Sequence, residues 1–438
     1  MTAPDPDAPR SVGAEHAPQS SPANVAAVQS RTVRVLVAGQ ILGGIGIGAT
    51  LSIGAVLAAE ISGSEAWSGA AATMSTLGAA LAAIPLARLA NQRGRRVALT
   101  VGILAAALGS VVTVFAAALV SFPLLLLGLA LLGSGAAVNL QSRFAATDIA
   151  SRQHRGRDLS IVVWSATIGA VLGPNLFGPG EVIADWLGMP ALTGSFTIAV
   201  TAQLLAALVF VLGLRPDPLV LSRSQPEEQP EPSGEGVVRA RTLVVFAIAA
   251  IGIGHAVMVS VMAMAPVHLL HHGAALTVVG LTISLHVAGM YALSPVFGWL
   301  SDRVGRIPTI LVGQALFGVA LAIVALGAQS QALVTVGLVF LGLGWSATTV
   351  SGSALVADLV TGPARTRIQG RTDLVMNLSG ALGAAAAGPV LAVIGYPGLA
   401  LCAGVLVAVV TAWAVIMRRP TVLLATPESA GDWGTRTD

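Results

Sequence analysis

Long apolar runs divide the sequence, and they restrict what it can fold into more than any other feature. A helix needs about 20 predominantly apolar residues to cross the ~30 Å hydrocarbon core of a bilayer. Twelve runs of that kind occur along the 438 residues, of which 55% are hydrophobic and only 10% charged. The sequence therefore predicts an all-α membrane protein with twelve transmembrane helices. The predicted spans are 34–59, 68–89, 97–119, 122–146, 159–179, 193–214, 242–268, 276–299, 308–327, 332–357, 374–394 and 397–417.

The polar segments indicate how the chain is divided. Residues 1–33 are rich in Pro, Ala, Ser and Asp and lack the apolar segment of a signal peptide, so we expect a disordered cytoplasmic tail. Residues 215–241 contain a Pro-, Glu- and Ser-rich stretch that predicts a solvated cytoplasmic linker. The linker separates predicted six-helix bundles at 34–214 and 242–417, and a cytoplasmic tail follows at 418–438.

The charged residues predict how the chain lies across the membrane. All 23 basic residues are arginines, and with the N-terminus inside none of them falls in an outer loop. Outer segments carry Glu60, Glu65, Glu181 and Asp185 instead. The positive-inside rule then places both termini in the cytoplasm, and we expect the protein in the cell inner membrane. Because this rule accounts for the basic character, that character does not indicate nucleic acid binding.

Landmarks in the first half recur in the same order in the second. Such order at a near-constant offset predicts two pseudo-symmetric bundles, the repeat architecture of secondary transporters. The matched landmarks are 92–96 (QRGRR) with 303–307 (RVGRI), 128–135 and Asp148 with 337–344 and Asp358, and Gly173-Pro174 with Gly388-Pro389.

The turn after span eight reads G-W-L-S-D-R-V-G-R from Gly298 to Arg306. It resembles the loop signature of the major facilitator superfamily (MFS), a resemblance that covers essentially the whole membrane-embedded length of the chain. The resemblance implies the MFS fold and alternating access to a small-molecule substrate. In the first-half copy, 87–96, Asn91 stands where the family has an Asp.

The resemblance also implies a gating role for two groups of residues at the cytoplasmic side. In the first-half latch Arg95 would meet Asp148, and in the second-half latch Arg306 would meet Asp358. The alternative is that these charges only anchor loops in water and lipid headgroups. Because Asn91 cannot be ionised, we expect the first-half latch to be the weaker one. The first-half latch is Asn91, Gly94, Arg95, Arg96 and Asp148, and the second-half latch is Gly298, Asp302, Arg303, Gly305, Arg306 and Asp358.

Span five contains G-A-V-L-G-P-N-L-F-G from Gly169 to Gly178, which partly resembles the G-x-x-x-G-P motif of bacterial proton-coupled drug antiporters. Small residues four apart let helices approach closely, and proline bends the backbone. The resemblance favours proton-coupled efflux of small amphipathic or drug-like molecules; a proton-coupled importer of a small metabolite is the alternative, ahead of a non-transporting membrane sensor. The expected hinge residues are Gly169, Gly173, Pro174, Gly388 and Pro389.

Polar side chains inside the spans are candidates for the substrate or proton site, because an ionisable group deep in a bilayer costs ~2.5–3.5 kcal/mol. His255 and His286 lie near mid-span, where each could carry the coupling proton, contact substrate, or form a neutral interhelical hydrogen bond. Arg143 could bind an anionic group, pair with Asp148 or reach the inner surface. Glu60, at the outer end of span one, is the carboxylate nearest to that span. The other candidates are Gln40, Asn139, Trp345, Asp373 and Asn377.

Several functions are not expected. His268, His271 and His272 have a spacing that could hold a metal ion, but with no carboxylate or cysteine nearby in the loop we expect a solvated outer rim and no metal. The chain has no lysine, which excludes the Gly-Lys phosphate-binding loop of ATP-driven transport. No loop is long enough for a catalytic domain. We therefore expect no enzyme activity and no cofactor, and a monomer whose partners are the lipid bilayer, a small-molecule substrate and protons.

Overall fold

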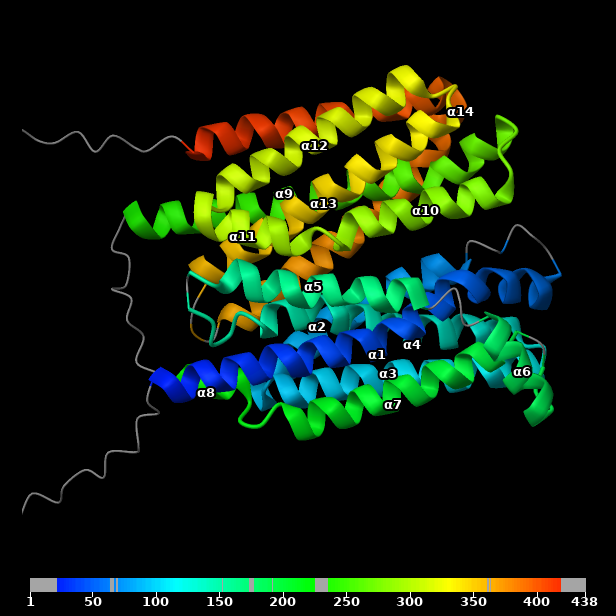
Figure 1. Ribbon diagram of the computed structural model, residues 1–438, viewed down its shortest axis with the longest axis horizontal. Coiled ribbons are helices and arrows are strands. Elements are labelled where there is room, and N and C mark those ends of the chain that lie inside the picture. Colours follow the sequence, from blue (N-terminus) through cyan, green and yellow to red (C-terminus); the bar gives the residue numbers. More distant parts are fainter. Residues whose placement is uncertain are drawn as a thin grey trace, which may run out of the picture. The chain divides into compact units, whose positions relative to one another are not determined.

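The computed structural model describes residues 22–63, 67, 70–151, 153–172, 177–190, 192–224, 235–360, 362 and 364–418. Helices joined by short turns make up this part of the chain, and it contains no β-strand (Figure 1). The helices are α1 (Pro22–Ser62), α2 (Ala70–Arg93), α3 (Arg95–Ala118), α4 (Phe122–Ala145), α5 (Arg155–Leu172), α6 (Phe177–Leu187), α7 (Gly194–Gly213), α8 (Pro218–Ser224), α9 (Glu235–His271), α10 (Leu276–Tyr291), α11 (Ser294–Val304), α12 (Arg306–Gly327), α13 (Gln331–Leu359) and α14 (Ala364–Arg418).

The predicted spans fall on these helices, which confirms the all-α fold. Among the described residues, nine helices are long and apolar enough to cross a membrane. One of them, α14, covers the last two predicted spans. Gly395 (φ 68°, ψ −178°) interrupts its helical backbone and separates the two spans. Helices α10 and α11 together cover span eight. Span five corresponds to α5 and the start of α6, and residues 173–176 between them lie outside the described part.

The chain forms two compact units. Unit 1 contains Met1–Glu235 and Val360–Asn377, and unit 2 contains Gly236–Leu359 and Leu378–Asp438. The division follows the two halves of the sequence except at the start of α14, which belongs to unit 1. The exact bundle boundaries expected from the sequence remain a prediction.

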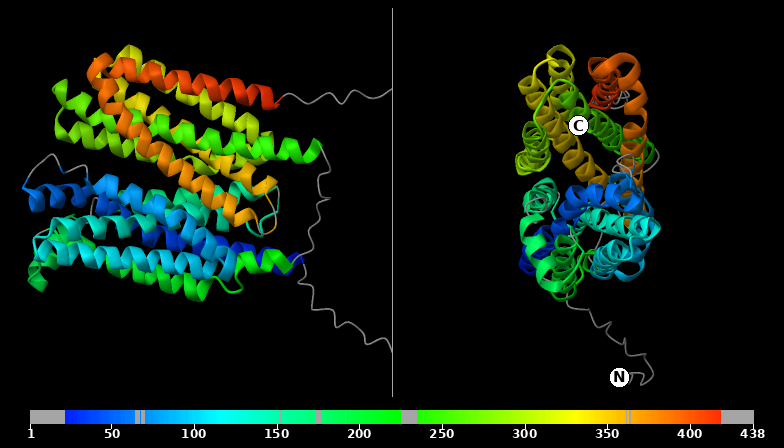
Figure 2. Two further views of the ribbon diagram at one scale, coloured as in Figure 1. Left: turned by 180° about the vertical axis from the view of Figure 1, so that it is seen from behind. Right: turned by 90° about the vertical axis from the view of Figure 1, so that its right-hand side faces the viewer.

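In unit 1, α3 packs against α4 and α7, while α1 contacts α4, α5 and α7. The views in Figure 2 show these helices running side by side. A Cβ atom added to Gly169 would lie only 2.7 Å from the Cα atom of Gly44, so α1 and α5 cross almost backbone to backbone. An apolar cluster that includes Leu36, Leu99 and Phe210 fills the interior.

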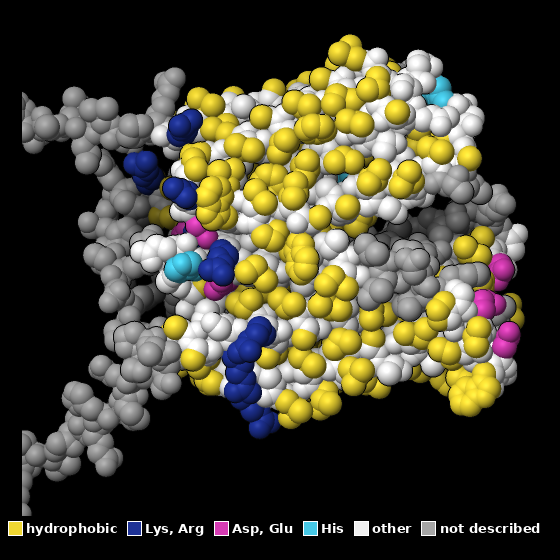
Figure 3. Space-filling model, viewed as in Figure 1, with side chains coloured by type: hydrophobic (Ala, Val, Ile, Leu, Met, Phe, Trp, Pro, Cys, Tyr) yellow, Lys and Arg dark blue, Asp and Glu magenta, His cyan; other side chains and the backbone are white. Residues whose placement is uncertain are grey.

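In unit 2, α13 packs against α10, α11 and α12. In both units large apolar side chains are exposed along the middle of the helices, for example Leu108, Phe115 and Leu401. Figure 3 shows hydrophobic side chains over most of the drawn face and arginines gathered near one end of the helices. Such a surface is unfavourable in water but matches a hydrocarbon environment with charged headgroups at its border.

Candidate functional site

Each of the two latches contains a glycine of nearly the same backbone conformation. Gly94 precedes α3 with φ 89° and ψ 170°, and Gly305 precedes α12 with φ 112° and ψ 161°. Residues with a side chain rarely adopt this region, so glycine is needed at both turns. Each glycine ends one helix and makes the following arginine, Arg95 or Arg306, the first residue of the next.

Both arginine–aspartate contacts implied by the resemblance are present. In unit 1, Arg95 donates from Nε to Asp148 Oδ2 at 2.8 Å and from Nη2 to Asp148 Oδ1 at 3.2 Å. In unit 2, Arg306 donates from Nε to Asp358 Oδ2 at 2.9 Å and also bonds to Asp302, four residues earlier. The gating role assigned to these contacts stays a prediction.

The first-half latch is the more deeply buried of the two, and the expectation that it is the weaker one stays a prediction. The side chains of Arg95 and Asp148 are 1% and 0% exposed, against 10% and 14% for Arg306 and Asp358. Gln369 accepts a further hydrogen bond from Arg95. Helix α14 thus supplies an acceptor to the first-half arginine, as Asp302 does to Arg306 in unit 2.

A second compensation for the missing acid comes from the segment around α8. Asp217 accepts a hydrogen bond from the backbone N–H of Arg96 at 2.7 Å through Oδ2, and through Oδ1 it accepts from the N–H of Leu219 at 3.0 Å. A carboxylate is therefore present at the first turn of α3, where the N–H groups and helix dipole favour one. No motif in the sequence predicts this role for Asp217.

The other end of α8 binds the same loop. Arg223 donates to the side-chain Oδ1 of Asn91 at 2.7 Å and to its backbone oxygen at 2.9 Å. Asp217 and Arg223 together tie α8 to both sides of the α2–α3 turn. Asn91 is therefore an acceptor within unit 1, although it carries no charge.

The start of α14, which belongs to unit 1, has a row of polar side chains that faces the other helices of that unit. Its residues are four apart in sequence, so they lie on one face of the helix, and each is no more than 8% exposed. Arg365 donates to the backbone oxygen of Thr147 at 2.8 Å, and its Nε lies 3.7 Å from Asp148 Oδ1. We call this set the α14 stripe, and it consists of Arg365, Gln369, Asp373 and Asn377.

Asp373 of the α14 stripe forms a deeply buried ion pair with Arg143 of α4. Arg143 Nη2 donates to Asp373 Oδ1 at 2.6 Å, and the two side chains are 2% and 1% exposed. Asn377 donates from its side chain to the backbone oxygen of Asp373 at 2.8 Å. The interpretation that Arg143 pairs with Asp148 is wrong, because Arg95 and Arg365 occupy that carboxylate.

The Arg143–Asp373 pair leaves hydrogen-bonding capacity unused. Asp373 Oδ2 and Arg143 Nε are buried and have no hydrogen-bond partner in the described part of the chain. The sulfur of Met376 lies 3.7 Å from Arg143, and the Phe144 ring centroid lies 5.0 Å from its guanidinium carbon. A half-satisfied buried ion pair costs stability, so such a pair calls for a functional explanation.

Two further candidates in unit 1 come together. Gln40 of α1 donates from its side chain to the backbone oxygen of Asn139 of α4 at 3.3 Å. On the same helix, Gln141 donates to the backbone oxygen of Ala83 of α2 at 3.2 Å. These contacts tie α4 to α1 and α2, beside the turn of α4 that carries Arg143.

In unit 2, the partners of two histidines indicate which ring nitrogen carries the proton. Trp345 donates from its indole nitrogen to His255 Nδ1 at 2.9 Å, so this nitrogen is an acceptor. His286 Nδ1 lies 2.7 Å from the backbone oxygen of Leu338, which only accepts, so His286 donates there and ties α10 to α13. Tyr291 packs edge-on against Trp345 with ring centroids 5.7 Å apart, which completes an aromatic group of His255, Trp345 and Tyr291.

The remaining candidate residues take no part in the hydrogen bonds and ion pairs described above. Gly173 and Pro174 lie outside the described residues, and α14 continues as a helix through Gly388 and Pro389. His268 Nε2 lies 2.7 Å from the backbone oxygen of Ala328. Within the described ranges, no group of three or more His, Cys, Asp or Glu side chains is placed to hold a metal ion.

Comparisons with known proteins agree with this architecture. The family model of the Major Facilitator Superfamily matches residues 36–273 and 244–435. The chain is 36% identical to the uncharacterized MFS-type transporter YdeG of Bacillus subtilis over 394 residues, which cover 88% of this chain and 92% of that protein. It is 30% identical to the riboflavin transporter RfnT of Brucella anthropi over 351 residues, 79% of this chain and 85% of that one.

Among solved structures, the human organic anion transporter MFSD10 matches with a TM-score of 0.70 at 14% identity, over 88% of this chain and 99% of that one. At this identity the likeness concerns the fold alone. The family model, the relatives and the apolar helices together make the protein a multi-pass membrane transporter and not an enzyme. The chain belongs to the major facilitator superfamily, as its loop signature implied.

Proposed function

We propose that the protein is a proton-coupled antiporter that exports small amphipathic molecules by alternating access. It would work as a monomer in the cell inner membrane with both termini in the cytoplasm. The observation that carries the proton coupling is the buried Arg143–Asp373 pair, which places a carboxylate with one unpartnered oxygen within a predominantly apolar bundle.

Protonation of Asp373 links proton binding to a change of structure. The proton removes the negative charge that faces Arg143, and among the described residues the other contacts of the guanidinium are the thioether of Met376 and the ring of Phe144. An uncompensated buried charge is strongly unfavourable, so Arg143 has to find another partner or reach water. The α14 stripe would leave α4 in that step. One proton and one conformational change are coupled in this way.

The substrate class is supported by the aromatic group of unit 2 and by one relative. Trp345 is buried, and the half-buried rings of His255 and Tyr291 that pack against it are the surfaces that a planar ring would contact. RfnT, 30% identical, is a riboflavin transporter. Planar heteroaromatic molecules with a polar substituent are therefore the first substrates to test.

The direction of transport has a separate basis. Export is favoured by the motif at Gly169, which lies at the close crossing of α1 and α5. The second candidate is proton-coupled uptake of a flavin-like molecule, favoured by the similarity to RfnT. The Arg143–Asp373 pair would couple protons in either direction.

Transport in everted membrane vesicles tests both parts of the proposal. We expect a panel of heteroaromatic compounds that includes riboflavin to show accumulation driven by a proton gradient with wild-type protein. Asp373→Asn should abolish this accumulation but retain exchange of labelled for unlabelled substrate, because exchange needs substrate binding and no net proton movement. Glu60→Gln is the matched control, since Glu60 is an exposed carboxylate at the predicted outer end of span one. This variant should accumulate substrate as the wild type does.

The outcomes are distinguishable. Gradient-driven accumulation that survives in Asp373→Asn would exclude Asp373 as the proton site, and its loss in Glu60→Gln would move the role there. Accumulation only in right-side-out vesicles would replace export by uptake. If Asp373→Asn fails to fold, the double variant Arg143→Gln with Asp373→Asn removes both charges, and it should exchange substrate without responding to the gradient.

A further inference from the structure

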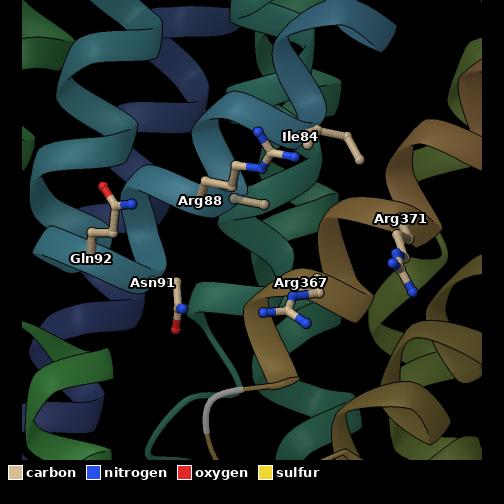
Figure 4. A pocket seen from close by; sticks show the side chains of 7 residues that line it. Ile84, Arg88, Asn91, Gln92, Arg367 and Arg371 are labelled. Atoms are coloured by element: carbon tan, nitrogen blue, oxygen red, sulfur yellow. The ribbon is translucent and has the colours of Figure 1, made fainter.

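A hollow in unit 1 brings together three arginines that belong to none of the ion pairs described above. Its volume is about 440 Å³, and it lies between the end of α2 and the start of α14. Apolar Ile84 and Ala87, polar Asn91, and the side chains of Arg88, Arg367 and Arg371 are among its lining residues. Figure 4 shows Arg88 and Asn91 on one helix and Arg367 and Arg371 on the other.

Helix periodicity explains why these arginines line the same hollow. Arg367 and Arg371 are four residues apart and exposed, whereas Arg365, Gln369 and Asp373 between and around them are buried in the α14 stripe. The start of α14 therefore has one face bound to α3 and α4 and another that carries two arginines toward α2. On α2, Arg88 lies four residues after Ile84 and three before Asn91, so these side chains share a face of the helix.

Among the described residues that line the hollow, none carries a negative charge to balance these arginines. No carboxylate lines it, and no ion pair or hydrogen bond joins Arg88, Arg367 or Arg371 to another described residue. The positive-inside rule explains why arginines lie at this end of the helices, but not why three of them from distant parts of the sequence share one hollow. Like charges so placed repel each other and weaken the packing of α14 on α2.

We propose that this hollow binds a phosphate-bearing anion, which bridges α2 and α14 and holds the start of α14 on unit 1. Guanidinium groups match phosphate oxygens in shape and charge, and several can bind one phosphate. Ile84 and Ala87 extend the site with an apolar wall further along α2. This chemistry suits the headgroup of an anionic phospholipid and also a soluble phosphate.

Thermal unfolding of the full chain in zwitterionic detergent tests the site. The probes are phosphatidylglycerol, phosphatidylcholine and inorganic phosphate, with chloride at equal ionic strength as the reference. The test variant is Arg88→Gln with Arg367→Gln and Arg371→Gln. Its control is Arg31→Gln with Arg34→Gln and Arg93→Gln, which removes the same charge from exposed arginines of α1 and α2 outside the hollow.

We expect phosphatidylglycerol or phosphate to raise the unfolding temperature of the wild type and of the control variant in a saturable manner. In the test variant the concentration needed for half of this effect should rise at least ~10-fold, which corresponds to about 1.4 kcal/mol of lost binding energy. Without either probe the test variant should unfold at or above the wild-type temperature, because the repulsion is gone.

Each result either identifies the bound anion or overturns the proposal. An effect of phosphatidylglycerol alone identifies a lipid headgroup as the source, and an effect of inorganic phosphate identifies a soluble anion. Equal losses in test and control variants, or no effect of either probe on the wild type, would overturn the proposal. If the test variant does not fold, the three arginines are changed to lysine, which keeps the charge but loses the paired N–H groups; affinity equal to wild type would then contradict recognition by guanidinium.

Discussion

Asp148→Asn is predicted to be a strongly destabilising change in the polar network of unit 1. Arg95 is 1% exposed and holds the carboxylate through bonds of 2.8 and 3.2 Å, and Arg365 lies 3.7 Å from it. The amide keeps the shape and one acceptor oxygen but removes the charge. Two arginines then face an uncharged group inside the unit.

The size of the effect follows from burial. Removing one partner of a buried ion pair costs about 3–5 kcal/mol, and the remaining amide acceptor places Asp148→Asn near ~3 kcal/mol. At roughly 2–4 °C per kcal/mol for a domain of 150–250 residues, the unfolding temperature should fall by ~6–12 °C. Asp358→Asn is the matched change in unit 2. Its pair is 10–14% exposed and Arg306 keeps Asp302, so we expect a loss of about 1 kcal/mol, or ~2–4 °C.

The assay is thermal unfolding of the purified full chain in detergent. A double variant, Arg95→Gln with Asp148→Asn, removes both members of the pair and should recover at least half of the loss, because Arg95, the more deeply buried of the two arginines, no longer lacks its partner, and Arg365 keeps its hydrogen bond to the backbone oxygen of Thr147. Burial does not set the cost of losing each carboxylate if Asp148→Asn costs no more than Asp358→Asn, or if the double variant is no more stable than the single one.

Two further predictions concern the turns between helices two and three of each half. Asp302→Asn should impair transport far more than Asn91→Ala, because the first change removes an ion pair with Arg306 and the second only one exposed side-chain hydrogen bond from Arg223; equal transport rates would mean that the second-half turn is an anchor and not a gate. Asp217→Ala should lower the stability of the protein by ~1–2 kcal/mol, measured by thermal unfolding, because the N–H groups of Arg96 and Leu219 lose their acceptor, whereas Asp217→Asn should lose less; equal losses would show that the charge and not the cap matters.

The helices and the latch turns could be predicted from the sequence because their signals are local. An apolar run such as 97–119 is itself the reason why α3 crosses hydrocarbon, and it lies within one residue of α3 at its C-terminal end. The glycine before Arg95 and the glycine before Arg306 each specify the same turn from their local sequence. The family signature added the pairing of each arginine with a distant aspartate, which spacing alone does not give.

The composition of the site could not be predicted in the same way because its partners are far apart. Gln369 binds Arg95 across 274 residues, and Asp373 binds Arg143 across 230. Only Asp373 and Asn377 were candidates from the sequence; Arg365 and Gln369 precede span eleven, and the four-residue spacing of all four residues places them on one face of α14. The sequence does not show which helices this face contacts, because that depends on how the start of α14 packs within unit 1. Asp217 gave no signal, since its role depends on where the chain turns after α7.

The assignment of Val360–Asn377 to unit 1 has a consequence for biosynthesis. After Glu235 leaves the ribosome, the 142 residues from 236 to 377 still have to be made before unit 1 is complete. At about 5–20 residues per second this takes roughly 7–30 s. During that time Arg143 has no carboxylate and Arg95 lacks Gln369, so the newly inserted first half waits in the translocation machinery or the bilayer with its charges incompletely matched. The last contacts of the first unit are thus made by nearly the last helix of the chain to be synthesised.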